Sequence, residues 1–308
     1  MKTGQVKILR VLLVLVILAL TLYLVDYRLV GKQLSGMRPG WLALGILLCH
    51  TTYWVFAWRW WYLAKRADAA MSYGQSLSDY LLGGLFNQVL PTGLAGPVYR
   101  AFRHAKRDCA DSTPVGIGRA LSIVALDRVS GLAAQAFITL LGTIALAFSY
   151  PWIGLWGTLA VLLTLIALVT GLRLASRRYE EFESALALAF RGRTEVLKIG
   201  ISSLLGVFLL SLAFYCAAQA IALELPFWRV ICVSPLILGA MVIPLSIAGW
   251  GIREAASGAL FLALGTNAAI GVAVSVSFGL MGLLSTSPGL VLWFFVGRDS
   301  QPGQVLRK

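Results

Sequence analysis

Long runs of apolar residues are the feature that most constrains this sequence. A helix needs about 20 apolar residues to cross the hydrocarbon layer of a bilayer, which is roughly 30 Å thick. Only 13% of the 308 residues are charged, whereas a soluble domain carries about 25%. We therefore predict an all-α polytopic membrane protein. The predicted crossings are 8–25, 41–58, 120–149, 152–172, 199–223 and 268–296.

Two further apolar segments, 77–99 and 230–264, are each interrupted midway by a proline. The interruptions are Leu90-Pro91-Thr92-Gly93 and Ile243-Pro244-Leu245-Ser246. Proline ends a helix, and irregular backbone at membrane depth must be surrounded by protein or water. We therefore predict that each segment is a re-entrant hairpin that lines a site. The alternative is a through-helix with a proline kink.

The distribution of basic residues supports the hairpins. We place the N-terminus in the cytoplasm and let each hairpin return to the side from which it entered. Most of the 26 lysine and arginine residues then fall on the cytoplasmic side, as the positive-inside rule requires. If either hairpin crossed fully, the basic segments after it would move to the opposite side. We expect a multi-pass protein of the cytoplasmic membrane with both termini in the cytoplasm.

An internal repeat fits the same arrangement. An offset of 153 residues aligns Leu90 to Arg100 with Ile243 to Arg253, with identical Pro, Ala, Gly and Arg at four positions. This offset also pairs three crossings and a hairpin in residues 1–150 with three crossings and a hairpin in residues 151–308. Because three crossings reverse the side of entry, we predict inverted repeats, which in transporters surround a substrate with broken helices. A duplication without transport is the alternative.

The residues after each interruption suit an anion. Gly96 followed by Pro97, and Gly249 in the second hairpin, suit the start of a helix. The free N–H groups and the dipole of a helix start favour negative charge. Arg100 and Arg253 follow about one turn later, where a guanidinium can bind phosphate oxygens in bidentate fashion. Arg100 is followed by other basic residues, so an alternative role for it is to face the anionic lipids of the inner leaflet.

Other ionisable groups at membrane depth need a partner or a function. They include Asp127, Arg128 and Glu254. Adjacent residues on a helix point about 100° apart, so we expect neither Asp127 with Arg128 nor Arg253 with Glu254 to pair. We expect cross-pairs instead, Glu254 with Arg128 or Asp127 with Arg253. The alternative places Asp127 and Arg128 at the inner interface, and Asn87 before the first interruption can bind a headgroup or cap the turn.

Two polar segments have expected places at the membrane surface. Tryptophan and tyrosine residues cluster around Arg59, as in an interfacial aromatic belt, although an arginine stacked on tryptophan can also help to bind lipid. The segment 173–198 mixes basic and acidic residues with apolar ones at helical spacing. We expect it to form a short cytoplasmic helix that lies on the membrane.

Composition and spacing exclude several classes of function. The net charge of +13 is spread thinly between apolar runs, so no nucleic-acid partner is expected. The four cysteines are widely separated, so neither a metal site nor a disulfide framework is indicated. No pattern of nucleophile and base indicates an enzyme, and no cofactor is expected.

Four motifs carry a resemblance that covers nearly the whole length of the sequence: Arg59-Trp60, Asn87-x-x-Leu90-Pro91 through Gly96 and Arg100, Asp127-Arg128-x-x-Gly131, and Pro244 to Glu254. With them the sequence resembles the lysylphosphatidylglycerol synthase transmembrane-region, or flippase-like, family. The resemblance implies a fold that moves an aminoacylated phospholipid between leaflets, and other relatives are linked to hopanoid or polyprenyl-phosphate sugar pathways. Members often carry an acidic residue where Pro97 stands, so the resemblance implies no carboxylate role in the first hairpin here and leaves the choice of headgroup open.

We expect a transporter that moves an anionic or phosphate-bearing lipid or glycolipid between the leaflets. The expected partner is a membrane phospholipid or a polyprenyl-phosphate lipid. A lipid-synthesis enzyme and a second copy of the chain are two further possible partners. The alternatives are a membrane-embedded polyprenyl-phosphate glycosyltransferase, which the lack of a D-x-D pair disfavours, and an accessory subunit of a lipid-modifying enzyme. The sequence ends soon after the last predicted crossing, so aminoacyl transfer is not expected. The candidate substrate-binding residues are Arg253, Glu254, Arg100, Asn87, Asp127, Arg128, Gly249 and Gly96.

Overall fold

The computed structural model describes residues 27–69, 71–89, 95–106, 115–241 and 250–292. Every regular element within these ranges is a helix. The predicted crossing 8–25, both interruptions and Gly249 lie outside the described residues. The helices are α2 (Tyr27–Ser35), α3 (Pro39–Arg66), α4 (Tyr73–Val89), α5 (Ala95–Ala105), α6 (Ile117–Ala147), α7 (Pro151–Arg178), α8 (Glu180–Ala189), α9 (Arg193–Ala220), α10 (Phe227–Ala240), α11 (Ile252–Ala263) and α12 (Ala268–Ser285).

Five helical segments are long and apolar enough to cross a bilayer. Each overlaps one of the predicted crossings, so the prediction of an all-helical polytopic membrane protein is confirmed. Most of the observed helices extend beyond the predicted apolar runs, because charged residues such as Lys65 and Arg66 continue α3 past the last apolar turn. The segments are Pro39–Arg66, Ile117–Ala147, Pro151–Arg178, Arg193–Ala220 and Ala268–Leu292.

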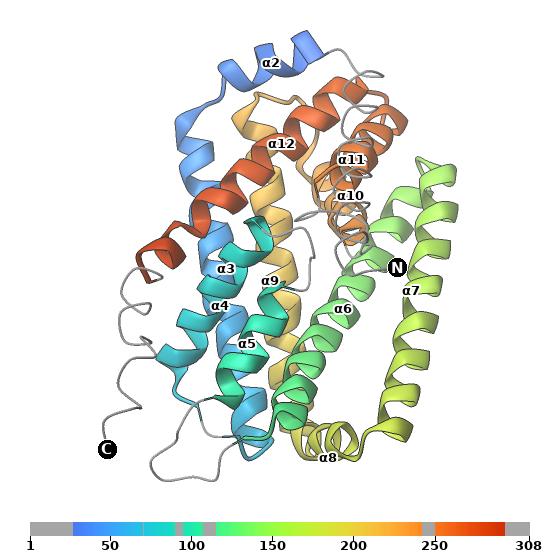
Figure 1. Cartoon of the computed structure of the whole chain (residues 1–308). Coiled ribbons are helices and arrows are strands. Elements are labelled where there is room, and N and C mark those ends of the chain that lie inside the picture. The colour runs from blue at the N-terminus through green and yellow to red at the C-terminus, as the bar shows by residue number, and fades with distance from the viewer. Residues whose placement is uncertain (1–26, 70, 90–94, 107–114, 242–249, 293–308) are drawn as a thin grey trace, which may run out of the picture.

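The two interrupted segments are pairs of short helices. At 1.5 Å per residue, α4, α5, α10 and α11 are about 25, 16, 21 and 18 Å long, against a hydrocarbon layer of roughly 30 Å. Helix α4 packs against α5, and α10 packs against α11. In Figure 1 the α4–α5 pair lies in the lower half of the molecule and the α10–α11 pair lies in the upper half.

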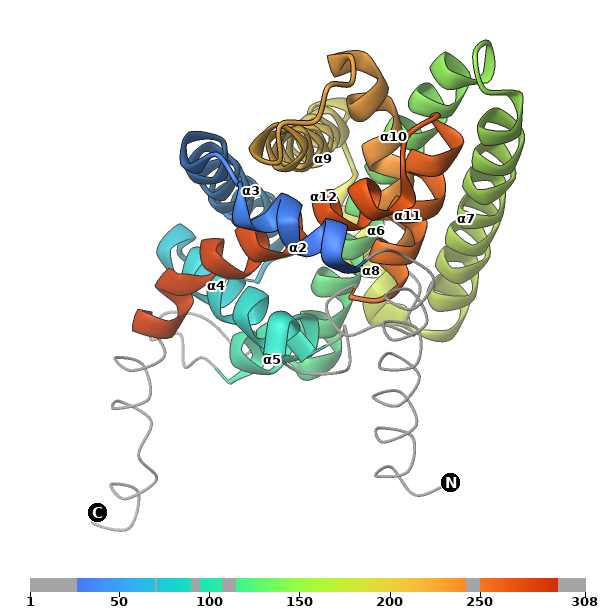
Figure 2. The ribbon, with the colours of Figure 1, turned by 90° about the horizontal axis from the view of Figure 1, so that it is seen from above.

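The long helices form a bundle against which these pairs pack. Helices α3 and α9 pack along each other, and α7 packs on α6 at one side of the molecule (Figures 1 and 2). Helix α8 closes the lower end and α2 lies across the upper end, so the predicted short helix in 173–198 is present. One apolar core gathers around Trp60, Leu63 and Leu126, and a second gathers around Phe214 and Phe261.

The contact between α6 and α10 depends on a glycine. A Cβ atom on Gly142 would overlap the backbone carbonyl of Cys232, whereas one on Gly200 would meet nothing within 4 Å. We expect Gly142→Ala to lower the free energy of unfolding by about 1–3 kcal/mol, because overpacking forces the helices apart. Gly200→Ala is the control and should be neutral or slightly stabilising. Equal melting temperatures for the two variants in one detergent would contradict this packing.

Candidate functional site

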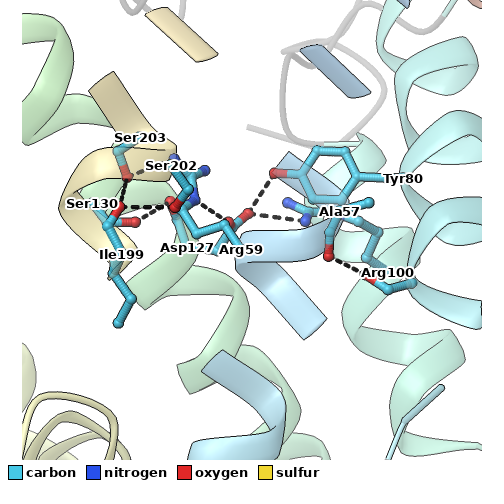
Figure 3. Close-up of polar contacts among 10 residues, drawn as sticks. Ala57, Arg59, Tyr80, Arg100, Asp127, Ser130, Ile199, Ser202 and Ser203 are labelled. Atoms are coloured by element: carbon cyan, nitrogen blue, oxygen red, sulfur yellow. Dashed lines mark hydrogen bonds and ion pairs between the residues drawn. The ribbon is translucent and has the colours of Figure 1, made fainter. Parts of the chain in front are cut away.

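A buried carboxylate on α6 joins this helix to α3, α4 and α5. The Oδ1 atom of Asp127 on α6 accepts a hydrogen bond from Nε of Arg59 on α3 at 2.8 Å. Its Oδ2 atom accepts hydrogen bonds from Nη1 of Arg100 on α5 at 2.9 Å and from the hydroxyl of Tyr80 on α4 at 2.6 Å (Figure 3). Arg59 also donates to Oγ of Ser203 on α9 at 3.0 Å. We call Arg59, Tyr80, Arg100 and Asp127 the Asp127 cluster.

Aromatic rings complete the surroundings of the two arginines. The guanidinium of Arg100 lies 4.0 Å from the centre of the Tyr80 ring and 4.9 Å from that of Trp60. The guanidinium of Arg59 lies 4.6 Å from the centre of the Phe56 ring. Both arginines are only 3% exposed, so the carboxylate and the ring faces replace the water that a buried cation loses. Two cations against one anion leave the cluster with a surplus positive charge.

Arg128 adds a second surplus charge beside the Asp127 cluster. It follows Asp127 on α6, its side chain is exposed, and it lies close enough for its charge to act on Arg100. Within the described part of the chain, Arg128 has no hydrogen bond or ion pair. Asp127 turns into the cluster instead, so the expectation that these neighbours do not pair is confirmed. An exposed guanidinium without an ion pair, next to a positively charged cluster, is well suited to an anionic group.

A second buried cluster lies where α11 begins. The Oε2 atom of Glu254 accepts a hydrogen bond from the backbone N–H of Gly251 at 2.6 Å. Its Oε1 atom accepts from Nη2 of Arg253 at 2.7 Å and from the hydroxyl of Ser275 on α12 at 2.9 Å. The guanidinium of Arg253 also lies 4.9 Å from the centre of the Trp250 ring. This Glu254 cluster contains one cation and one anion and is therefore neutral.

The structure corrects the predicted pairing of the buried charges. Arg253 pairs with its neighbour Glu254, and Asp127 pairs with Arg59 and Arg100, so both predicted cross-pairs are wrong. The argument from helical geometry considered the direction of each Cα–Cβ bond and neglected the reach of long side chains. In the first turn of α11, Glu254 turns back to a free backbone N–H, and Arg253 reaches it there.

The remaining predicted site residues shape the start of α5. The side-chain Oδ1 of Asn87 accepts a hydrogen bond from the backbone N–H of Gly96 at 2.9 Å, so Asn87 caps the turn. A Cβ atom on Gly96 would overlap the backbone carbonyl of Gly83. Glycine at position 96 therefore lets α5 approach α4 closely. The binding roles of Asn87 and Gly96 remain predictions.

Sequence reasoning did not find every member of the clusters. Arg59 and Trp60, expected in an interfacial belt, are buried inside the bundle, whereas Trp54 is exposed. The available signal for Arg59 was an arginine directly after the predicted crossing 41–58, among tryptophans. No pattern in the sequence distinguishes Tyr80 from other tyrosines near a membrane surface. In the described ranges, no group of three His, Cys, Asp or Glu residues could hold a metal ion.

Comparison with known proteins identifies one family. The model of the family described as "Lysylphosphatidylglycerol synthase TM region" matches residues 7–289. The match spans every helix from α2 to α12. No curated protein matches the chain.

Proposed function

We propose that this chain, which belongs to the lysylphosphatidylglycerol synthase transmembrane-region family, moves an anionic or phosphate-bearing lipid between the leaflets of the cytoplasmic membrane. Membrane domains of this family are associated with lipid modification or flipping. The single observation that carries the proposal is the surplus of positive charge around Asp127. Two guanidiniums pair with one carboxylate there, and a third guanidinium, that of Arg128, is exposed beside them.

The charge surplus favours a negatively charged headgroup over a neutral one. An ionised residue at the centre of a membrane helix costs on the order of 2.5–3.5 kcal/mol unless it is paired or hydrated. Asp127 compensates part of the charge of Arg59 and Arg100, and a phosphate group would compensate Arg128. The two buried arginines are already paired with the carboxylate of Asp127. They therefore attract a lipid headgroup only moderately, and the headgroup can dissociate again.

The arrangement of the two helix pairs would allow the site to open toward either leaflet in turn. We infer that α4–α5 and α10–α11 are re-entrant hairpins and that residues 1–150 and 151–308 form inverted repeats. Their lengths fall short of the hydrocarbon layer, and Figure 1 draws them in opposite halves. Basic residues end α3, α5 and α7 near the end that α8 closes, so this end is the proposed cytoplasmic face.

Leaflet exchange in liposomes tests the proposal through Arg128. We expect the purified chain to exchange a fluorescent anionic lipid between leaflets, and Arg128→Gln to slow this exchange at least about tenfold, because a hydrogen bond to a charged group contributes about 1.5–3 kcal/mol. Arg128→Lys keeps the charge and should retain part of the activity. The matched control is Arg178→Gln, which removes an exposed arginine from the end of α7 and should exchange lipid at the wild-type rate.

Two results would count against the proposal. Equal rates of lipid exchange by the wild type and by Arg128→Gln would show that the assigned site takes no part in transport. The formation of a new glycolipid after incubation with polyprenyl-phosphate-sugar donors would favour a glycosyltransferase instead.

A further inference from the structure

A groove of about 430 Å³ opens between the lower parts of α3 and α9. Its walls include Trp54 and Trp58 from α3, and Ile201 and Leu205 from α9, and Lys198 lies at its edge. Trp54, Ile201 and Leu205 are 47%, 62% and 45% exposed. Because α3 and α9 are both long enough to cross the bilayer, these exposed apolar side chains face lipid. The groove is therefore open to the acyl chains of the membrane.

The groove is cationic at one end and apolar at the other. Lys198 stands near the first residue of α9, and Leu205 lies two turns further along this helix. The distance along the helix axis between these two positions is about 10 Å. Trp58 lies closer to the end of α3 than Trp54 does. The ammonium therefore lies toward the ends of the helices, where lipid headgroups are found, and the apolar walls extend toward the membrane interior.

The charge of Lys198 is available to a ligand. In the described part of the chain Lys198 forms no hydrogen bond or ion pair, and its Nζ atom lies 5.2 Å from the centre of the Tyr62 ring. The carboxylate of Glu195, one turn earlier on α9, is paired with Arg66 at 3.6 Å and interacts with Lys198 only at longer range. No carboxylate lines the groove. The electrostatic attraction of this site is therefore toward an anion.

We propose that this groove binds one acyl chain of an anionic phospholipid and that the phosphate of this lipid contacts Lys198. The volume lies within the roughly 300–1,000 Å³ of sites that bind small molecules, and tryptophan with lysine is a typical lining at the depth of headgroups. The site goes beyond the proposed transport function, because a resident lipid binds here whether or not the chain moves lipid. Ser202 lines the groove. The next residue, Ser203, accepts a hydrogen bond from Arg59 of the Asp127 cluster.

Quenching of tryptophan fluorescence by brominated lipids tests this site. The full-length chain is reconstituted in phosphatidylcholine vesicles that contain a minor fraction of brominated phosphatidylglycerol or brominated phosphatidylcholine. We expect the brominated phosphatidylglycerol to quench more strongly, and Lys198→Gln to reduce its relative affinity about fivefold. Replacing Trp54 and Trp58 with phenylalanine should remove the additional quenching, because both tryptophans line the groove.

Lys65→Gln is the matched control. Lys65 also lies on an aromatic ring, 5.4 Å from the centre of Trp61, at the end of α3 but outside the groove. Its replacement should leave the preference for phosphatidylglycerol unchanged. Equal quenching by the two brominated lipids, or an equal effect of Lys65→Gln and Lys198→Gln, would overturn the proposed site.

Leaflet exchange by the same vesicles separates this inference from the transport proposal. If exchange persists while the preference for phosphatidylglycerol is absent, only the groove site fails. If the preference is present and depends on Lys198 but no exchange occurs, the transport proposal fails and the groove site is supported.

Discussion

Replacing Asp127 with alanine is expected to lower the free energy of unfolding by about 3–5 kcal/mol, because the loss of one partner leaves buried charges uncompensated. Asp127 is fully buried and accepts hydrogen bonds from Arg59, Tyr80 and Arg100. These residues come from three different helices, so the variant also loosens the attachment of α4 and α5 to the bundle. Asp127→Asn keeps the volume but removes the charge, and we expect it to destabilise the chain as well.

Thermal unfolding in detergent, followed by circular dichroism, measures this effect. Glu183→Ala is the control, because Glu183 is an exposed carboxylate on α8 and its removal should change stability little. A double-mutant cycle isolates the ion pair: the combined variant Asp127→Ala with Arg59→Met should lose less stability than the sum of the single losses. Additive losses would mean that Asp127 and Arg59 do not stabilise each other.

The membrane topology was the part of the fold most open to prediction from sequence. A crossing requires a certain length of apolar side chains whatever its neighbours are, so five predicted crossings coincide with observed helices. The ends of these helices were less predictable, because an arginine or a lysine can continue a helix and extend to the interface. Pro91 and Pro244 lie outside the described residues, and on either side of them the chain forms shorter helices that pack in pairs, α4 with α5 and α10 with α11.

The membership of the two clusters was harder to predict. Arg100, Asp127, Arg253 and Glu254 are conspicuous because they are ionisable residues in apolar surroundings. The partners of Arg100 and Asp127 depend on how α3, α4, α5 and α6 pack together, which cannot be read from the spacing of residues in the sequence. Arg253 and Glu254 pair with each other and also contact Ser275 on α12. The participation of Tyr80 depends entirely on the approach of α4 to α6, which brings its hydroxyl to Asp127. For the same reason, the surplus of charge at the first cluster and the neutrality of the second emerged only from the structure.

Glu254→Ala is the other substitution with a large expected effect. It leaves the guanidinium of Arg253 buried without its carboxylate and leaves the backbone N–H of Gly251 without its acceptor. Gly251 has a φ of 86°, a conformation that glycine adopts readily, so Glu254 also holds this turn at the start of α11. We expect a loss of about 3–5 kcal/mol, measured by thermal unfolding as before. Ser275→Ala removes a neutral hydroxyl that bonds to both Arg253 and Glu254 but leaves their ion pair intact, so it should cost less, about 1.5–3 kcal/mol. A larger loss from Ser275→Ala than from Glu254→Ala would contradict this assignment.

A double variant separates the structural role of this pair from a role in binding lipid. Arg253→Met with Glu254→Gln removes both charges and keeps an acceptor for Gly251, so we expect a stability close to that of the wild type, because replacing a buried ion pair by groups of similar volume is often neutral. We also expect the double variant to exchange anionic lipid normally, since the charge surplus lies at the Asp127 cluster and Arg128. Loss of exchange by a folded double variant would instead place the headgroup at Arg253, as the sequence alone predicts.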